Sequence, residues 1–239
     1  MRFLTVGDCA ISVEFGNEIN AEINNKIIVF NNIIKDSNIN GIIETVPSFR
    51  SLLVYYDPLK LYFYEIKDIL SNLYKKLDIK NNNNKRIIEI PICYDKDFGV
   101  DLEFVGDYTN LSLDEVIKLH SEKEYLIYML GFLPGFAYLG GMNKKLNTPR
   151  LNTPRLNLEV GSVGIGGEQT GIYPLVSPGG WRIIGRTPLK LYDINREDTI
   201  LYKAGDYIKF IPIDKDEFYE IENLANKGKY ELKILERSA

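Results

Sequence analysis

The segment from Gly131 to Pro188 decides how the chain folds, and it reads GFLPGFAYLGGMNKKLNTPRLNTPRLNLEVGSVGIGGEQTGIYPLVSPGGWRIIGRTP. Glycine, proline, arginine and aromatic residues are denser here than in the rest of the chain. A solvated linker would not need the aromatic side chains of Phe136 and Tyr138, and a plain core would not need a glycine pair such as Gly166-Gly167. Glycine permits turns with positive φ and close approach of the backbone. The segment therefore predicts a binding surface built on a rigid β framework.

Strand-like runs separated by Gly/Pro turns continue on both sides of this segment. The expected strands are Tyr125–Leu130, Ser162–Ile165, Trp181–Ile184, Leu189–Tyr192, Tyr207–Ile211 and a closing strand at Tyr230–Leu235. One helix is expected to begin at the capping box of Ser112 and Glu115, and another to span Phe218–Asn226. Many short strands joined by such turns predict a sandwich or a barrel for residues 91–239.

The first ninety residues show a different pattern, in which helical periodicity lies between short strands. Strands are expected at Phe3–Val6, Ile11–Phe15, Ile42–Val46, Leu52–Tyr56 and Arg86–Ile90, and amphipathic helices at 19–34 and Leu61–Leu77. The order β-α-β-β-α-β is that of a ferredoxin-like split unit. We place the boundary after the last strand, which gives one domain at 1–90 and a second at 91–239 in an α+β chain. The polar run Asp78–Lys85 is either a domain linker or an exposed loop before that strand.

Composition restricts the class of protein. A net charge of −4 gives no electrostatic support for nucleic-acid binding. The N-terminal residues MRFLTVGDCAISVEF lack the pattern of a signal peptide, and no apolar run approaches the roughly 18 residues of a membrane span. Cys9 and Cys93 are far apart and do not form a disulfide framework. We therefore expect a cytoplasmic protein with free thiols that binds neither membrane nor nucleic acid.

His120 is the only histidine, and this excludes much chemistry. A multi-histidine metal site is impossible, and a four-ligand zinc site is implausible with two cysteines, so no metal ligands are assigned on this chain. His120 lies on the apolar face of its expected helix. It is either a buried histidine hydrogen-bonded within the core, or a proton donor or acceptor near the glycine-rich segment.

Four arginines accompany the glycine-rich segment: Arg150, Arg155, Arg182 and Arg186. Arginine suits a planar, bidentate grip on carboxylate or phosphate, and otherwise forms surface charge. Arg150 and Arg155 end two tandem copies of LNTPR. Side chains on an extended chain alternate with period two, so a five-residue repeat predicts that these two arginines serve different neighbours.

Polar and aromatic groups surround the arginines in the sequence. Hydrogen-bonding side chains are offered by Gln169, Thr170, Tyr173 and Ser177, and aromatic surface by Phe136, Tyr138 and Trp181. Gly166 and Gly167 either form a hairpin of the barrel or a nest of backbone N–H groups for an anion. Trp181 is either a core anchor or a stacking platform. The Gly-Lys-Ser/Thr loop of a nucleotide-binding P-loop is absent.

The blocks GFLPGFAYLGG, TPR, GSVGIGGEQTGIYPL and SPGGWRIIGRTP, in this order, resemble the family of 5-oxoprolinase B subunits. The same family is called KipI-like or allophanate hydrolase subunit 1. The opening GDCAISVEFG resembles the family's first motif, so the similarity extends over the chain. One departure is Ala137, where the family commonly has proline.

The resemblance implies a ferredoxin-like N-terminal domain and a cyclophilin-like β-barrel. It implies a protein that is inactive alone and acts with a homologous C component and a lactam-opening A component of 5-oxoprolinase to convert 5-oxoproline to glutamate with ATP and Mg²⁺. Some members instead bind a sensor histidine kinase and inhibit its autophosphorylation, which is the alternative function. A prolyl isomerase role would rest on the barrel fold alone.

For the enzyme role, the expected site divides into two sets. His120, Arg150, Arg155 and Arg186 form the catalytic set, in which the arginines neutralise phosphate or carboxylate and His120 moves a proton or holds the glycine-rich strand. The substrate-binding set is Phe136, Tyr138, Gly166, Gly167, Gln169, Thr170, Tyr173 and Ser177. Chemistry of this kind depends mostly on positioning and charge neutralisation.

Overall fold

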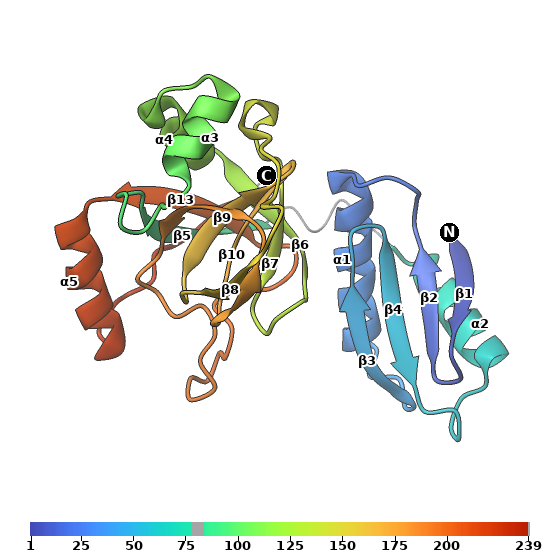
Figure 1. Ribbon diagram of the computed structural model, residues 1–239. Coiled ribbons are helices and arrows are strands. Elements are labelled where there is room, and N and C mark those ends of the chain that lie inside the picture. Colours follow the sequence, from blue (N-terminus) through green and yellow to red (C-terminus); the bar gives the residue numbers. More distant parts are fainter. Residues whose placement is uncertain (78–83, 239) are drawn as a thin grey trace. The chain divides into compact units, whose positions relative to one another are not determined.

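The computed structural model describes residues 1–77 and 84–238. The chain divides into two compact units, Met1–Asn83 and Asn84–Ala239, which are described separately (Figure 1). Of the polar run Asp78–Lys85, residues 78–83 lie outside the described residues. None of the helices formed by the described residues is both long and apolar enough to cross a membrane.

The N-terminal unit is a four-stranded antiparallel sheet in the order β1-β2-β4-β3. The strands are β1 (Arg2–Val6), β2 (Ala10–Glu14), β3 (Ile42–Pro47) and β4 (Ser51–Tyr56), and the helices are α1 (Ala21–Asp36) and α2 (Phe63–Tyr74). The helices cover one face of the sheet (Figure 1). Alternate residues of β2 and β4, such as Ile11, Val13 and Leu52, join the buried faces of the helices in one core. Asn20 begins α1, and its Oδ1 accepts a hydrogen bond from the Glu22 N–H at 2.7 Å.

One strand of the expected ferredoxin-like unit lies elsewhere. The strand predicted at Arg86–Ile90 is part of β5 (Asn84–Cys93), which pairs with strands of the second unit. The placement of this strand in the N-terminal domain, and of the boundary after residue 90, was therefore wrong. The edge of the N-terminal sheet beside β2 is taken by β1, which forms a hairpin with β2. The four-stranded sheet is thus complete without a strand after α2.

The second unit contains a closed barrel of seven strands. Around the ring the order is β12 (Arg182–Arg186), β9 (Ser162–Gly166), β10 (Gln169–Ile172), β7 (Ala137–Gly140), β6 (Glu124–Leu130), β13 (Tyr207–Ile213) and β5. The ring closes where Arg186 of β12 pairs with Cys93 of β5. β14 (Ile234–Ser238) pairs with the first half of β5. Inward-facing residues such as Val163, Ile165 and Phe210 fill the barrel.

Helices and a small second sheet decorate the barrel (Figure 1). They are α3 (Leu102–Thr109), α4 (Leu113–Ser121), the 3-10 turn η2 (Lys144–Leu146), α5 (Lys215–Asn226) and the two-stranded sheet of β8 (Arg155–Leu158) with β11 (Ser177–Gly179). The capping box predicted at Ser112 and Glu115 is confirmed, since the Ser112 N–H donates to Glu115 Oε2 at 2.9 Å. Helix α3 was not predicted, although it holds part of the site described below.

The strand predicted at Leu189–Tyr192 is wrong. Only Tyr192 forms an isolated bridge, with Ile200. The carbonyls of Lys190 and Leu191, which a strand would use in its ladder, accept hydrogen bonds from the Arg196 guanidinium at 3.0 and 3.2 Å. The apolar residues of this run are still buried, but they pack onto the core from a loop.

The position of β5 leads to a test by truncation. A fragment of residues 84–239 is expected to unfold cooperatively in urea, whereas a fragment of residues 91–239 is not. The shorter fragment lacks the part of β5 that pairs with β14 and with the first half of β13, so its sheet cannot close. Fluorescence of Trp181 during a urea titration measures this. An equally cooperative transition for the shorter fragment would contradict the assignment of β5 to the barrel.

Candidate active site

A small aromatic pocket lies on the outer side of the barrel strands. It has a volume of about 160 Å³ and is lined by Phe132, Phe136, Tyr138, Arg150, Tyr173, Gly179, Gly180 and Trp181. Four of the predicted site residues meet here: Phe136, Tyr138, Arg150 and Tyr173. The described residues that line the pocket include no carboxylate, histidine or cysteine. The pocket can therefore bind and orient a small molecule, and it offers no general base of ordinary pKa.

Glycines make room for the wall that Trp181 forms. Val163 and Ile165 of β9 point into the barrel core, so Gly164 and Gly166 face outward. A Cβ on Gly166 would lie 2.4 Å from Trp181 Cδ1, and a Cβ on Gly164 would lie 3.1 Å from its Cβ. The indole thus packs directly on the backbone of β9. Trp181 is 6% exposed, so it is an anchor and a pocket wall at once.

Gly166 and Gly167 form a hairpin. Gly166 pairs with Gln169, and Gly167 has a φ of +66°, which suits the first turn residue of a type II′ hairpin. The Gly167 N–H donates to the Thr148 carbonyl at 2.8 Å. This amide is therefore engaged within the protein, and of the two alternatives for these glycines the structure shows the hairpin.

Phe132 forms an exposed rim of the pocket in a strained backbone conformation. Its φ is +67°, and the Leu133 N–H donates to the Gly131 carbonyl at 2.8 Å, closing a three-residue turn around it. A turn of this kind with positive φ is rare and strained for a bulky residue. The ring of Phe132 lies edge-on to Phe136, with centroids 5.5 Å apart. Such strain concentrates at binding and catalytic sites.

Arg150 supplies the positive charge of the pocket. Its Cζ lies 5.7 Å from the centroid of the Trp181 ring. Burial raises the pKa of the Tyr173 hydroxyl, and the Trp181 backbone and the nearby Arg150 guanidinium oppose this rise. The described residues place no carboxylate within ion-pair distance of Arg150. An exposed guanidinium without an internal acid, above aromatic walls, favours a small planar anion such as a carboxylate.

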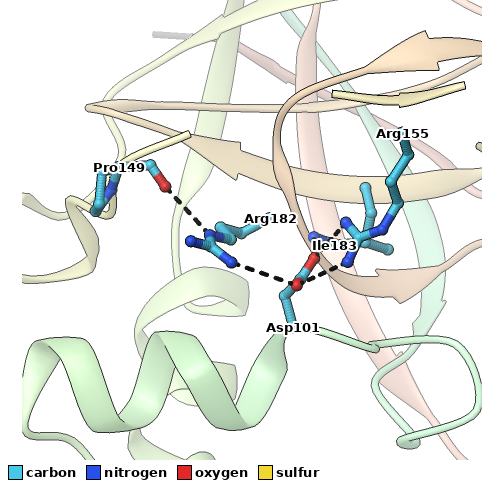
Figure 2. Close-up of polar contacts among 5 residues, drawn as sticks. All are labelled: Asp101, Pro149, Arg155, Arg182 and Ile183. Atoms are coloured by element: carbon cyan, nitrogen blue, oxygen red, sulfur yellow. Dashed lines mark hydrogen bonds and ion pairs between the residues drawn. The ribbon is translucent and has the colours of Figure 1, made fainter. Parts of the chain in front are cut away.

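Arg155 is bound to a carboxylate of the protein itself (Figure 2). Its Nη1 and Nη2 donate to Asp101 Oδ2 and Oδ1 at 2.7 and 2.9 Å. The hydrogen bond to Asp101 raises the pKa of the Arg155 guanidinium. Since Arg150 contacts Trp181 and Arg155 contacts Asp101, the prediction that the two arginines serve different neighbours is confirmed.

Arg186 lies apart from the pocket. Its Nε donates to the Val160 carbonyl at 3.0 Å, and its guanidinium lies 5.9 Å from the Phe98 ring centroid and 5.8 Å from that of Phe218. Arg186 is not among the residues that line the pocket. The structure thus brings Arg150 alone, of the three arginines predicted as catalytic, to the aromatic walls.

His120 is fully buried and fully hydrogen-bonded. Its Nδ1 lies 2.8 Å from the Tyr94 hydroxyl and its Nε2 2.8 Å from Thr170 Oγ1. Thr170 Oγ1 donates to the Gly164 carbonyl at 3.0 Å, so it accepts from the His120 Nε2–H, and Nδ1 accepts from Tyr94. Burial lowers the pKa of His120 to about 3. Of the two alternatives for His120, the structure shows the buried one, in which it holds the glycine-rich strand through Thr170.

The remaining predicted residues flank the pocket without lining it. Gln169 is half-buried at the start of β10. Ser177 is buried in β11, and its Oγ has no hydrogen-bond partner among the described residues. Sequence reasoning did not select Phe132, Gly179 and Gly180, although the aromatic and glycine density around them was a usable signal. It also missed Asp101, for which the sequence gives only a carboxylate at a helix start.

A barrel that presents an arginine within an aromatic pocket, beside a four-stranded α/β unit, matches a known class of domain. The family model described as carboxyltransferase domain, subdomain C and D, matches residues 1–202. The 5-oxoprolinase B subunit of Bacillus subtilis (strain 168) is 39% identical over 231 residues, which cover 92% of this chain and 96% of that protein. The 5-oxoprolinase B subunit of Escherichia coli O157:H7 is 48% identical over 127 residues, which cover 53% of this chain and 58% of that protein. The chain therefore belongs to the carboxyltransferase subdomain C and D family and, within it, to the group of 5-oxoprolinase B subunits that its motifs predicted.

Solved structures agree with this placement. The crystal structure of TTHA0988 is 33% identical, with a TM-score of 0.77, and covers 86% of this chain. This chain spans 40% of that longer protein.

The packing of Trp181 on Gly166 gives a stability test. Gly166→Ala is expected to reduce the free energy of unfolding by about 1–3 kcal/mol, because its Cβ would overlap the indole ring. Gly180→Ala is the matched control, since its Cβ would meet nothing closer than 3.6 Å and its φ is not positive. Urea titrations followed by Trp181 emission compare the two. Equal midpoints for both variants would contradict the close packing.

The buried state of His120 gives a pH test. Its pKa is about 3 when folded and 6.5 in an ordinary environment, so the unfolded chain binds more protons between these values. The contribution of His120 to the free energy of unfolding therefore falls as the pH drops from 6.5 towards 3, by at most about 1.4 kcal/mol per pH unit. His120→Gln is expected to be destabilised at pH 7.5, and the gap to the natural protein should narrow by about 2 kcal/mol at pH 5. A gap that does not change with pH would refute a neutral buried imidazole.

Proposed function

We propose that this chain is the B subunit of a 5-oxoprolinase, inactive alone, that acts with the A and C components of that enzyme to convert 5-oxoproline to glutamate at the expense of ATP. Two relatives of this chain are named as B subunits of 5-oxoprolinase. The observation that carries the proposal at the level of the site is the pairing of Arg150 with aromatic walls in a pocket of about 160 Å³. 5-Oxoproline is a small five-membered lactam with one carboxylate. The carboxylate would face Arg150, and the ring would lie against Phe136 and Trp181.

The pocket suits binding and orientation rather than proton transfer. Its described lining contains tyrosines but no group that titrates near neutral pH. Holding a reactant in a fixed geometry can by itself lower a barrier by several kcal/mol. We therefore assign to this chain the role of placing the lactam, and to another component of the enzyme the groups that open it. Arg155, Arg186 and His120, which were expected in the catalytic set, have internal partners and support the fold around the pocket.

ATP and Mg²⁺ do not fit the residues of this chain. The pocket is smaller than the roughly 300–1,000 Å³ of common ligand sites, and the Gly167 amide of the glycine-rich turn is bonded to Thr148. Among residues 1–77 and 84–238, no three His, Cys, Asp or Glu side chains gather in a group that could hold a metal. ATP would supply the energy to open a stable amide, and we propose that a partner protein binds it with its Mg²⁺.

The remaining family expectations belong to the same proposal. We infer a cyclophilin-like type for the barrel, a ferredoxin-like unit whose last strand is replaced by β1, and a cytoplasmic location. Inhibition of a sensor histidine kinase stays a prediction of the motif resemblance. Stoichiometric binding of a kinase, together with no gain of ring opening when the A and C components are added, would favour that alternative.

Substitution of Arg150 tests the proposed site. Arg150→Ala in a complex reconstituted with the A and C components is expected to lower kcat/KM for 5-oxoproline about 10- to 100-fold, because a charge-assisted hydrogen bond to the substrate carboxylate is lost. Arg237→Ala is the control, since it removes an exposed arginine that pairs with Glu124 in the same unit. ATP-dependent release of glutamate measures the rate. Equal rates for Arg150→Ala and the natural complex would reject Arg150 as the substrate's partner.

A further inference from the structure

Asp101 is a buried carboxylate at which three segments of the barrel unit meet. It is 6% exposed and lies directly before α3. Besides the two hydrogen bonds from Arg155, its Oδ2 accepts the Ile183 N–H at 2.7 Å, and its own N–H donates to the Ile183 carbonyl at 2.8 Å. Arg182 Nη1 lies 3.7 Å from Oδ1. One side chain thus joins α3 to β8 and β12 (Figure 2).

Arg182 extends this network towards the pocket. Its Nε donates to the Pro149 carbonyl at 3.3 Å (Figure 2). Its guanidinium stacks on Phe104 of α3, with Cζ 3.6 Å from the ring centroid. The Arg182 side chain is only 16% exposed, so it is held between the carboxylate, the ring and the carbonyl. A planar group with several N–H donors is needed to make these contacts together.

The Pro149 carbonyl belongs to the peptide bond that leads into Arg150. On the other side of Arg150, the Leu151 N–H donates to the Gly180 carbonyl at 2.7 Å. The backbone of this exposed arginine is therefore fixed at both of its neighbours, by Arg182 before it and by Gly180 after it. Gly180 directly precedes Trp181, on which the Arg150 guanidinium lies. The two attachments set where the cation stands relative to the aromatic wall.

We propose that Asp101 and Arg182 are positioning residues that place Arg150 over Trp181 and so determine the affinity of the pocket for its acidic ligand. Asp101 orients Arg182, Arg182 holds the Pro149 carbonyl, and the peptide bond carries this constraint to Arg150. Arg155 has a different part, since its two-pronged contact fastens β8 to Asp101. The inference about ligand affinity rests on the proposed function, whereas the inference about the placement of Arg150 does not.

A merely structural role for Asp101 predicts something different. Burial of a carboxylate whose partners are removed destabilises a protein, whatever the carboxylate positions. Arg182→Lys separates the two roles. Lysine keeps the charge beside Asp101, but its single ammonium cannot stack on Phe104 and also reach the Pro149 carbonyl. The variant therefore releases the backbone before Arg150 while Asp101 keeps its bonds to Arg155 and Ile183.

The test uses the full chain and the fluorescence of Trp181, its only tryptophan. A cation 5.7 Å from the indole raises the local concentration of an anionic quencher. Iodide quenching, divided by quenching with neutral acrylamide, is expected to fall about twofold in Arg150→Ala. We expect a similar fall in Arg182→Lys and Asp101→Asn. Asp97→Asn is the matched control, because Asp97 pairs with Lys215 at an exposed position and should leave the ratio unchanged.

A second readout uses the complex reconstituted with the A and C components. Arg182→Lys and Asp101→Asn are expected to raise KM for 5-oxoproline about tenfold with a smaller change in kcat, and Asp97→Asn to change neither. If Arg182→Lys keeps the quenching ratio of the natural chain while Arg150→Ala lowers it, the positioning role is overturned. If the ratios fall as expected but Arg150→Ala leaves ring opening unchanged, the positioning role stands and the proposed substrate site fails. Because Arg182→Lys keeps the Asp101 contacts, the test remains decisive even if Asp101→Asn does not fold.

Discussion

The region around the pocket depends on one buried carboxylate. Asp101 lies between α3, β8 and β12, and it is almost fully removed from solvent. A carboxylate buried without partners costs several kcal/mol, so its surroundings must supply donors. Arg155, Arg182 and the Ile183 N–H supply them. This requirement explains why two of the arginines near the glycine-rich segment are committed inward, and why Arg150 is left to face a ligand.

The pocket also depends on the absence of side chains. Trp181 can lie flat on β9 only because the outward positions of that strand are glycines, and Gly171 of β10 leaves room for the far edge of the indole. The inward positions of the same strands carry the valine and isoleucine of the barrel core. One strand therefore serves two purposes, with alternate residues filling the barrel and clearing a place for the aromatic wall. A binding surface formed in this way is as rigid as the sheet beneath it.

The sequence predicted what local patterns encode and failed where partners are distant. Helical periodicity predicted α1 and α2, and the capping box predicted the start of α4. The strand at Arg86–Ile90 was found, but nothing within it states that its neighbours are β13 and β14 rather than β2. In the same way, arginine and aromatic density predicted the pocket segment. Which arginine remains available depends on Asp101, a residue far from that segment in the chain and without a distinguishing local pattern.

The closed ring has a consequence for how the protein assembles. Strands that alternate in direction around a ring can do so completely only if their number is even, and this barrel has seven. One neighbouring pair must therefore run the same way, and that pair is β13 with β5. These are the first and last strands of the ring in chain order, so the seam joins segments that leave the ribosome far apart in time. The pocket strands between them can form hairpins early, but the cylinder is sealed only after nearly the whole unit has been synthesised.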